Sequence, residues 1–137
     1  MTPLAVAATL LGLVALATVL GTAWKVSTGR VRRLTGDVVR LPEVPIEGRA
    51  TLLQFSTQLC APCAPTRRVL GQIAASTDGV NHVDLDLTHR PDVAARFNVL
   101  QTPTTLILDR TGAIRARIGG APRQADVRAA LASILAA

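Results

Sequence analysis

The stretch TLLQFSTQLCAPC, residues 51–63, joins a short apolar run to the only two cysteines of the chain. Residues 51–55 have the length and composition of a buried strand, and the polar segment after them predicts a loop. Residues 61–75 carry apolar side chains at helical spacing and are followed by Thr77-Asp78-Gly79, which predicts an amphipathic helix. Cys60 and Cys63 are therefore expected where a strand passes into a helix.

Two residues separate the cysteines, so they can close a small disulfide ring. The first N–H groups of a helix and the positive end of its dipole stabilise a thiolate, and we therefore expect Cys60, the more exposed cysteine, to act as the nucleophile. Cys63, one turn into the helix, would resolve the mixed disulfide by attacking the sulfur of Cys60. The motif predicts disulfide exchange without a metal or an organic cofactor.

The rest of the chain alternates strands and helices. Residues 83–87 alternate apolar and polar side chains, as in a strand, and residues 91–97 form a short helix after Pro91. A hairpin and a last helix follow at 104–108, 113–118 and 123–135. Because strands separated by helices pair in parallel and a hairpin adds antiparallel neighbours, we expect a mixed sheet flanked by helices, an α/β fold.

The first part of the chain has a different character, because no charged residue occurs between Leu4 and Trp24. At about 1.5 Å per residue this run measures roughly 31 Å, close to the ~30 Å of a bilayer's hydrocarbon core. We interpret residues 1–25 as a transmembrane anchor, 26–48 as a basic juxtamembrane linker with an edge strand at 38–41, and 49–137 as the catalytic domain. A cleaved signal peptide is the competing interpretation.

The charge distribution predicts membrane contact rather than nucleic-acid binding. The formal net charge is +6, and Lys25, Arg30, Arg32 and Arg33 supply four of these charges. Positive charge stays on the cytoplasmic side, so the domain is expected in the cytoplasm, with the basic cluster against anionic lipid. Aromatic residues make up only 2 % of the chain, which argues against binding of single-stranded nucleic acid by stacking.

Three features together resemble the thioredoxin family, and the resemblance covers residues 50–137. They are the motif Cys60-Ala61-Pro62-Cys63 after a strand, Thr102-Pro103-Thr104 at the start of a later strand, and Gly119 at the end of the hairpin. The resemblance implies a thioredoxin-like fold in which Pro103 follows a cis peptide bond and packs against the disulfide. It also implies that the Thr102 backbone pairs with an extended substrate segment and that Gly119 lines the substrate groove.

The same resemblance implies a protein-disulfide reductase that acts on protein substrates and receives electrons from a thioredoxin reductase or another donor. Two other functions stay open: an extracytoplasmic thiol oxidoreductase for cytochrome maturation or disulfide formation, and a redox-inert membrane adaptor. A zinc site formed by the cysteines with His82 and His89 would have spacing unlike that of common zinc fingers, and no metal site is predicted.

The sequence also departs from the family pattern. Leu59 and Ser56 stand where the family has tryptophans, and Gln54 replaces a buried aspartate beneath the second cysteine. Asp84 stands where a lysine is usual, and we take it as a candidate proton acceptor for Cys63, the alternative being an ordinary exposed strand aspartate. The family's first strand and long first helix have almost no room before Ala50, so a trimmed version is expected.

Overall fold

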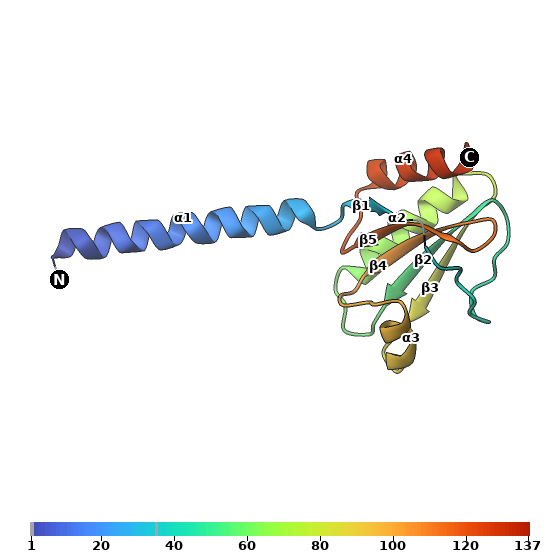
Figure 1. The fold of residues 1–137 in the computed structure, drawn as a ribbon, viewed down its shortest axis with the longest axis horizontal. Helices are drawn as coiled ribbons and strands as arrows, with labels where there is room; N and C mark the ends of the chain where they lie inside the picture. Colours follow the sequence, from blue (N-terminus) through green and yellow to red (C-terminus); the bar gives the residue numbers. More distant parts are fainter. Residues whose placement is uncertain (1, 35) are drawn as a thin grey trace.

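The computed structural model describes residues 2–34 and 36–137, and Figure 1 shows a long helix joined to an α/β domain. Met1 and Thr35, which belong to the predicted anchor and linker, lie outside the described residues. The described elements are α1 (Pro3–Ser27), β1 (Val31–Arg33), β2 (Ala50–Ser56), α2 (Cys63–Ala75), β3 (Val80–Asp86), α3 (Pro91–Arg96), β4 (Thr104–Asp109), β5 (Ile114–Gly119) and α4 (Gln124–Leu135). From β2 onward this is the order that the sequence predicts.

The strands form one mixed sheet in the order β1-β5-β4-β2-β3. β2 and β3 run parallel because α2 carries the chain back across the sheet between them. The pairs β2/β4, β4/β5 and β1/β5 are antiparallel. The predicted combination of a parallel crossover and a hairpin is therefore confirmed.

Both faces of the sheet are covered. Alternate residues of β2 point to opposite faces, so Leu52 packs with α2 and α4, whereas Leu53 and Phe55 pack with α3. Figure 1 shows α2 and α4 on one side of the sheet and α3 on the other. On the α3 side the rings of Phe55 and Phe97 are stacked with centroids 5.6 Å apart. β2 is buried along its whole length, and this includes its polar residues Thr51, Gln54 and Ser56.

The linker predicted at 26–48 needs correction, because much of it belongs to the domain. β1 pairs with β5 through the register Val31↔Ile118, and Val39 and Val44 are buried in the core on the α3 side. The edge strand expected at 38–41 is reduced to a single bridge between Val38 and Ala113. β1 lies at an edge of the sheet, and its two arginines are exposed there. Its sequence therefore resembles that of a solvent-exposed linker.

α1 projects from the domain as one uninterrupted helix (Figure 1). It contains 25 residues, its most apolar window has a mean hydropathy of 2.3, and none of that window is buried against the domain. A helix of this length measures about 38 Å and can span a bilayer. A signal sequence near an amino terminus has the same properties.

Candidate active site

The two cysteines are joined by a disulfide at the start of α2. Their Cα atoms are 5.4 Å apart, and the backbone N–H of Cys63 donates a hydrogen bond to the carbonyl oxygen of Cys60. Cys63 is the first residue of the helix and is only 3 % exposed, whereas Cys60 lies in the preceding turn and is partly exposed. An incoming sulfur can therefore reach Cys60 more readily than Cys63, as the sequence predicts.

Gln54 lies beneath the disulfide and is fully buried on β2. Its Nε2 donates a hydrogen bond of 3.0 Å to the carbonyl oxygen of Cys63, and its Oε1 lies 3.3 Å from Nε2 of His82 on β3. Because an amide oxygen only accepts, that nitrogen of His82 must carry the proton of this hydrogen bond. The side-chain amide of Gln54 therefore connects β3 to the start of α2. The sequence analysis did not predict this role.

The environment of His82 keeps its imidazole neutral. Burial lowers the pKa of His82 below its ordinary value of 6.5. The positive charge of Arg67 lowers this pKa further, and the negative charge of Asp84 opposes both effects. The histidine beside the motif is thus a neutral hydrogen-bonding group near pH 7.

Asp84 ties the sheet to α2. Its carboxylate forms an ion pair with Arg67 of the helix and accepts a hydrogen bond of 2.7 Å from the hydroxyl of Ser56. Its side chain is 18 % exposed, so it is more enclosed than an ordinary surface carboxylate. Among the described residues, no hydrogen bond joins Asp84 to either cysteine.

The structure brings the three predicted substrate-binding residues together at one rim. The Thr102–Pro103 peptide bond is cis, and Pro103 is buried. The N–H of Gly120 donates to the carbonyl oxygen of Pro103 at 2.8 Å, which places Gly119 beside this loop. The hydroxyls of Thr57 and Thr102 are 3.2 Å apart, so the rim is tied to the loop before Cys60.

Two features of this rim were not foreseen. The side chain of Gln101 lies over Gly119, where an added Cβ would come within 2.4 Å of its Nε2. Leu59 and Leu100 stand out from the loops joined by the threonine pair, and they are 100 % and 86 % exposed. An amide and two exposed leucines therefore border this rim. The exposure of Leu100 depends on the path of its loop, which the sequence does not reveal.

The described residues contain no group of three or more His, Cys, Asp and Glu side chains that could hold a metal ion. The reactive group of the site is the disulfide itself. A disulfide at the start of a helix, on a mixed sheet beside a cis-proline loop, defines the class of thioredoxin-fold proteins with a redox-active CxxC pair.

Comparison with known proteins agrees with this class. The family model described as Thioredoxin matches residues 42–133, and the chain belongs to the thioredoxin family. Over 77 residues it is 31 % identical to thioredoxin H2 of Arabidopsis thaliana, an alignment that covers 56 % of this chain and 58 % of that protein. It is 29 % identical over 80 residues to a thioredoxin of Staphylococcus saprophyticus, covering 58 % of this chain and 77 % of the relative.

Solved structures show the same fold. Chloroplastic thioredoxin z superposes with a TM-score of 0.59 at 25 % identity, covering 66 % of this chain and 81 % of that one. A thioredoxin from Nicotiana alata gives a TM-score of 0.55 at 26 % identity, with coverages of 63 % and 73 %. α1 lies before the residues that the family model matches. Family membership and the bonded cysteine pair together support thiol–disulfide oxidoreductase chemistry.

Proposed function

We propose that this chain reduces disulfides in other proteins by a dithiol–disulfide exchange at Cys60 and Cys63. One observation carries the proposal: the two sulfurs form a bond at the start of a helix, with one cysteine accessible and the other buried. The helix start favours the thiolate of the reduced form, since backbone N–H groups and the helix dipole stabilise negative charge there.

The exchange has two steps. In the reduced protein the Cys60 thiolate attacks one sulfur of the substrate disulfide, which forms a mixed disulfide and releases the first substrate thiolate. Cys63 then loses its proton and attacks the sulfur of Cys60, which releases the second substrate thiolate. Both released thiolates take up protons, and two electrons have passed from the cysteine pair to the substrate.

The surrounding residues have distinct proposed roles. Thr102 would pair its backbone with an extended substrate segment, Pro103 would pack against the disulfide, and Gly119 would line the substrate groove. Asp84 would accept the proton of Cys63, directly or through water, as part of its network with Ser56 and Arg67. If so, replacing Asp84 with Asn shifts the pH profile of reduction; an unchanged profile would show that the carboxylate acts only as a structural ion pair.

Another molecule must supply electrons, because each turnover leaves Cys60 and Cys63 oxidised. A thioredoxin reductase is the proposed donor, in keeping with the family. We further propose that α1 anchors the chain in a membrane with the domain on the cytoplasmic side, since the basic residues follow the span. An alkaline phosphatase fused after Ala137 tests the sidedness, because its activity in the periplasm would place the domain outside.

Reduction of insulin by the full chain with dithiothreitol tests the exchange. The wild type should accelerate insulin precipitation, and Cys60→Ser should reduce the rate to that of dithiothreitol alone. In a separate incubation of the prereduced protein with insulin, without dithiothreitol, Cys63→Ser should complete the first step and accumulate a mixed disulfide at Cys60, visible as a reducible adduct on a gel. Wild-type activity equal to that of Cys60→Ser would instead favour the adaptor.

A further inference from the structure

The active site and α1 lie at the same end of the sheet. Phe55, at the end of β2, pairs with Thr104, and Thr104 pairs with Gly119 at the end of β5. Ile118 in turn pairs with Val31, the first residue of β1. The loop to Cys60, the cis-proline loop and the residues that follow α1 therefore meet at one end, and Figure 1 shows α1 joining the domain there.

The connection between α1 and the domain is short and packed. Three residues separate the helix from β1, which can span at most about 11 Å. The N–H of Gly29 donates to the carbonyl oxygen of Gly119 at 2.8 Å. Gly29 has φ +81°, and a Cβ there would lie 2.4 Å from the carbonyl oxygen of Ala121. This turn fits closely against the rim, so the domain is not suspended on a mobile linker.

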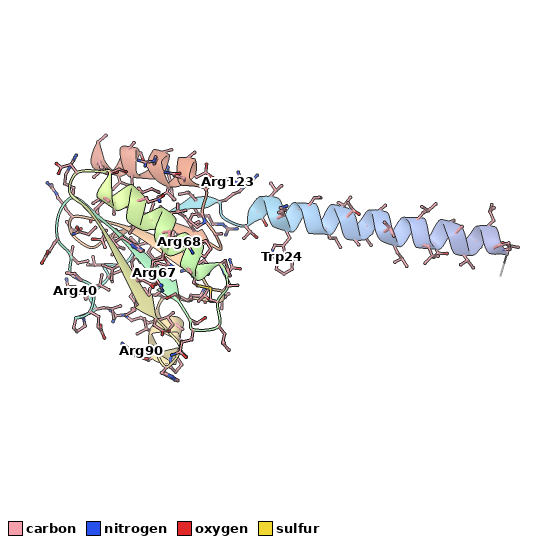
Figure 2. All side chains as sticks on the ribbon, turned by 180° about the vertical axis from the view of Figure 1, so that it is seen from behind. Trp24, Arg40, Arg67, Arg68, Arg90 and Arg123 are labelled. Atoms are coloured by element: carbon pink, nitrogen blue, oxygen red, sulfur yellow. A yellow bond between two sulfur atoms is a disulfide. The ribbon has the colours of Figure 1, made fainter. Side chains whose placement is uncertain are left out.

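The residues near this junction suit a bilayer surface. Trp24 is exposed near the end of α1, at the depth where interfacial aromatic residues lie. Figure 2 shows Arg123, from the far end of the sequence, on the side of the domain where α1 joins. Together with the exposed Arg30, it adds positive charge that attracts anionic lipid. In a chain anchored through α1, this connection and these charges would hold the redox end of the domain toward the membrane.

We propose that the preferred substrates of this chain are disulfides of membrane-embedded proteins that lie close to the bilayer surface. This inference rests on the exchange activity and the anchoring proposed above. The exposed Leu59 and Leu100 give the site an apolar rim, which matches the apolar side chains that border transmembrane segments. The chemistry is the same two-step exchange, in which the cysteine pair is oxidised and the substrate disulfide becomes two thiols.

The test uses the full chain in phospholipid vesicles, reduced beforehand so that one turnover needs no added reductant. Two synthetic single-span peptides serve as substrates and carry the same disulfide-closed loop. One holds the loop directly at the bilayer surface, and the other holds it on a proline-rich stalk of about 8 residues, roughly 25 Å long. The wild type should reduce the surface loop at least about tenfold faster, because only that loop is within reach at high effective concentration.

The decisive variant carries a flexible Gly-Ser spacer of about 20 residues between Ser27 and Thr28, with an r.m.s. length of roughly 25 Å. It leaves the Gly29–Gly119 contact and β1 intact and should lose most of the preference for the surface loop. The same spacer appended after Ala137 is the control and should keep the preference. Equal rates on both peptides with the wild type, or a preference that survives the internal spacer, would overturn the inference.

Insulin reduction in detergent separates this inference from the proposed function. All three proteins should reduce insulin at similar rates, since none changes the cysteine pair or its surroundings. If the chain reduces insulin but shows no preference for the loop at the bilayer surface, only the proposed substrate class is overturned. Loss of insulin reduction in the wild type overturns the exchange function itself.

Discussion

Gln54 places a polar side chain in the most buried strand of the sheet, and its amide serves two neighbours at once. It donates to the carbonyl oxygen of Cys63 and accepts from His82. Replacing Gln54 with Leu removes both bonds and leaves a half-buried imidazole N–H without its partner, so the free energy of unfolding should fall by about 1–3 kcal/mol. Urea denaturation measures this loss. Gln72→Leu on the exposed face of α2 is the matched control, and an equal loss there would contradict the explanation.

His82 predicts how stability depends on pH. Burial lowers its folded pKa below 6.5, so between the two pKa values the unfolded chain binds more protons than the folded one. Stability from this group is complete above about pH 6.5 and decreases as the pH falls through the folded pKa. His82→Gln should flatten this decrease between about pH 7 and pH 5 in urea titrations. His89→Gln, on an exposed loop, should leave it in place; a similar flattening there would exclude His82 as the cause.

The candidate site was predictable where a local motif defines it and not where it depends on packing. The cysteine pair at the start of a helix and the cis bond before Pro103 could be expected, because residue type and order along the chain carry this information. The role of Gln54 required knowing that β3 runs beside β2, in a register that brings His82 within hydrogen-bond distance of Gln54. The ion pair between Asp84 and Arg67 could not be predicted, because it depends on how close α2 lies to the sheet, and no sequence pattern encodes that distance.

The hairpin formed by β4 and β5 depends on one carboxylate in its turn. Burial alone would raise the pKa of Asp109, but hydrogen bonds from Thr111, Arg115 and the backbone outweigh it and lower this pKa from 3.8 to about 2. The side chain is only 13 % exposed, so solvent screens these interactions weakly. The stabilisation is present above about pH 4 and is lost as the pH falls toward 2.

Asp109→Ala should therefore lower the free energy of unfolding by about 2 kcal/mol at pH 7. It should also reduce the dependence of stability on pH between about pH 4 and pH 2, because the group responsible is gone. Urea denaturation at both ends of this range measures the two effects. Asp78→Ala, in an exposed turn, should change neither, and a mutant hairpin as stable as the wild type at pH 7 would contradict the prediction.

The strands that could be predicted share a visible pattern. β2 carries the apolar side chains of Leu52, Leu53 and Phe55 close together. The predicted strand at 83–87 overlaps most of β3, because apolar and polar side chains alternate along it. β1 has no such pattern. It is held by its pairing with β5 and by the hydrogen bond from the N–H of Gly29 to the carbonyl oxygen of Gly119. An edge strand of three residues takes its place from its neighbour rather than from its own composition.

The amino-terminal boundary of the folded unit can be tested with two fragments. A fragment of residues 29–137 keeps β1 and the buried Val39 and Val44, whereas residues 49–137 lack all three. Burial of these two valines contributes about 3–6 kcal/mol, so the shorter fragment should be less stable by at least that amount. It should also aggregate more readily, because the edge of β5 is uncovered. Equal unfolding midpoints in urea would place the boundary at residue 49 after all.

The three-residue connection between α1 and β1 has a kinetic consequence for an anchored chain. A catalyst restricted to a thin layer meets its partners by lateral diffusion, and the confinement of both molecules to that layer makes their encounters more frequent. Under these conditions a collision does not need to be long-lived to be productive. The choice of substrate would then depend mainly on which disulfides lie within that layer, and tight binding of the substrate in the groove would matter less.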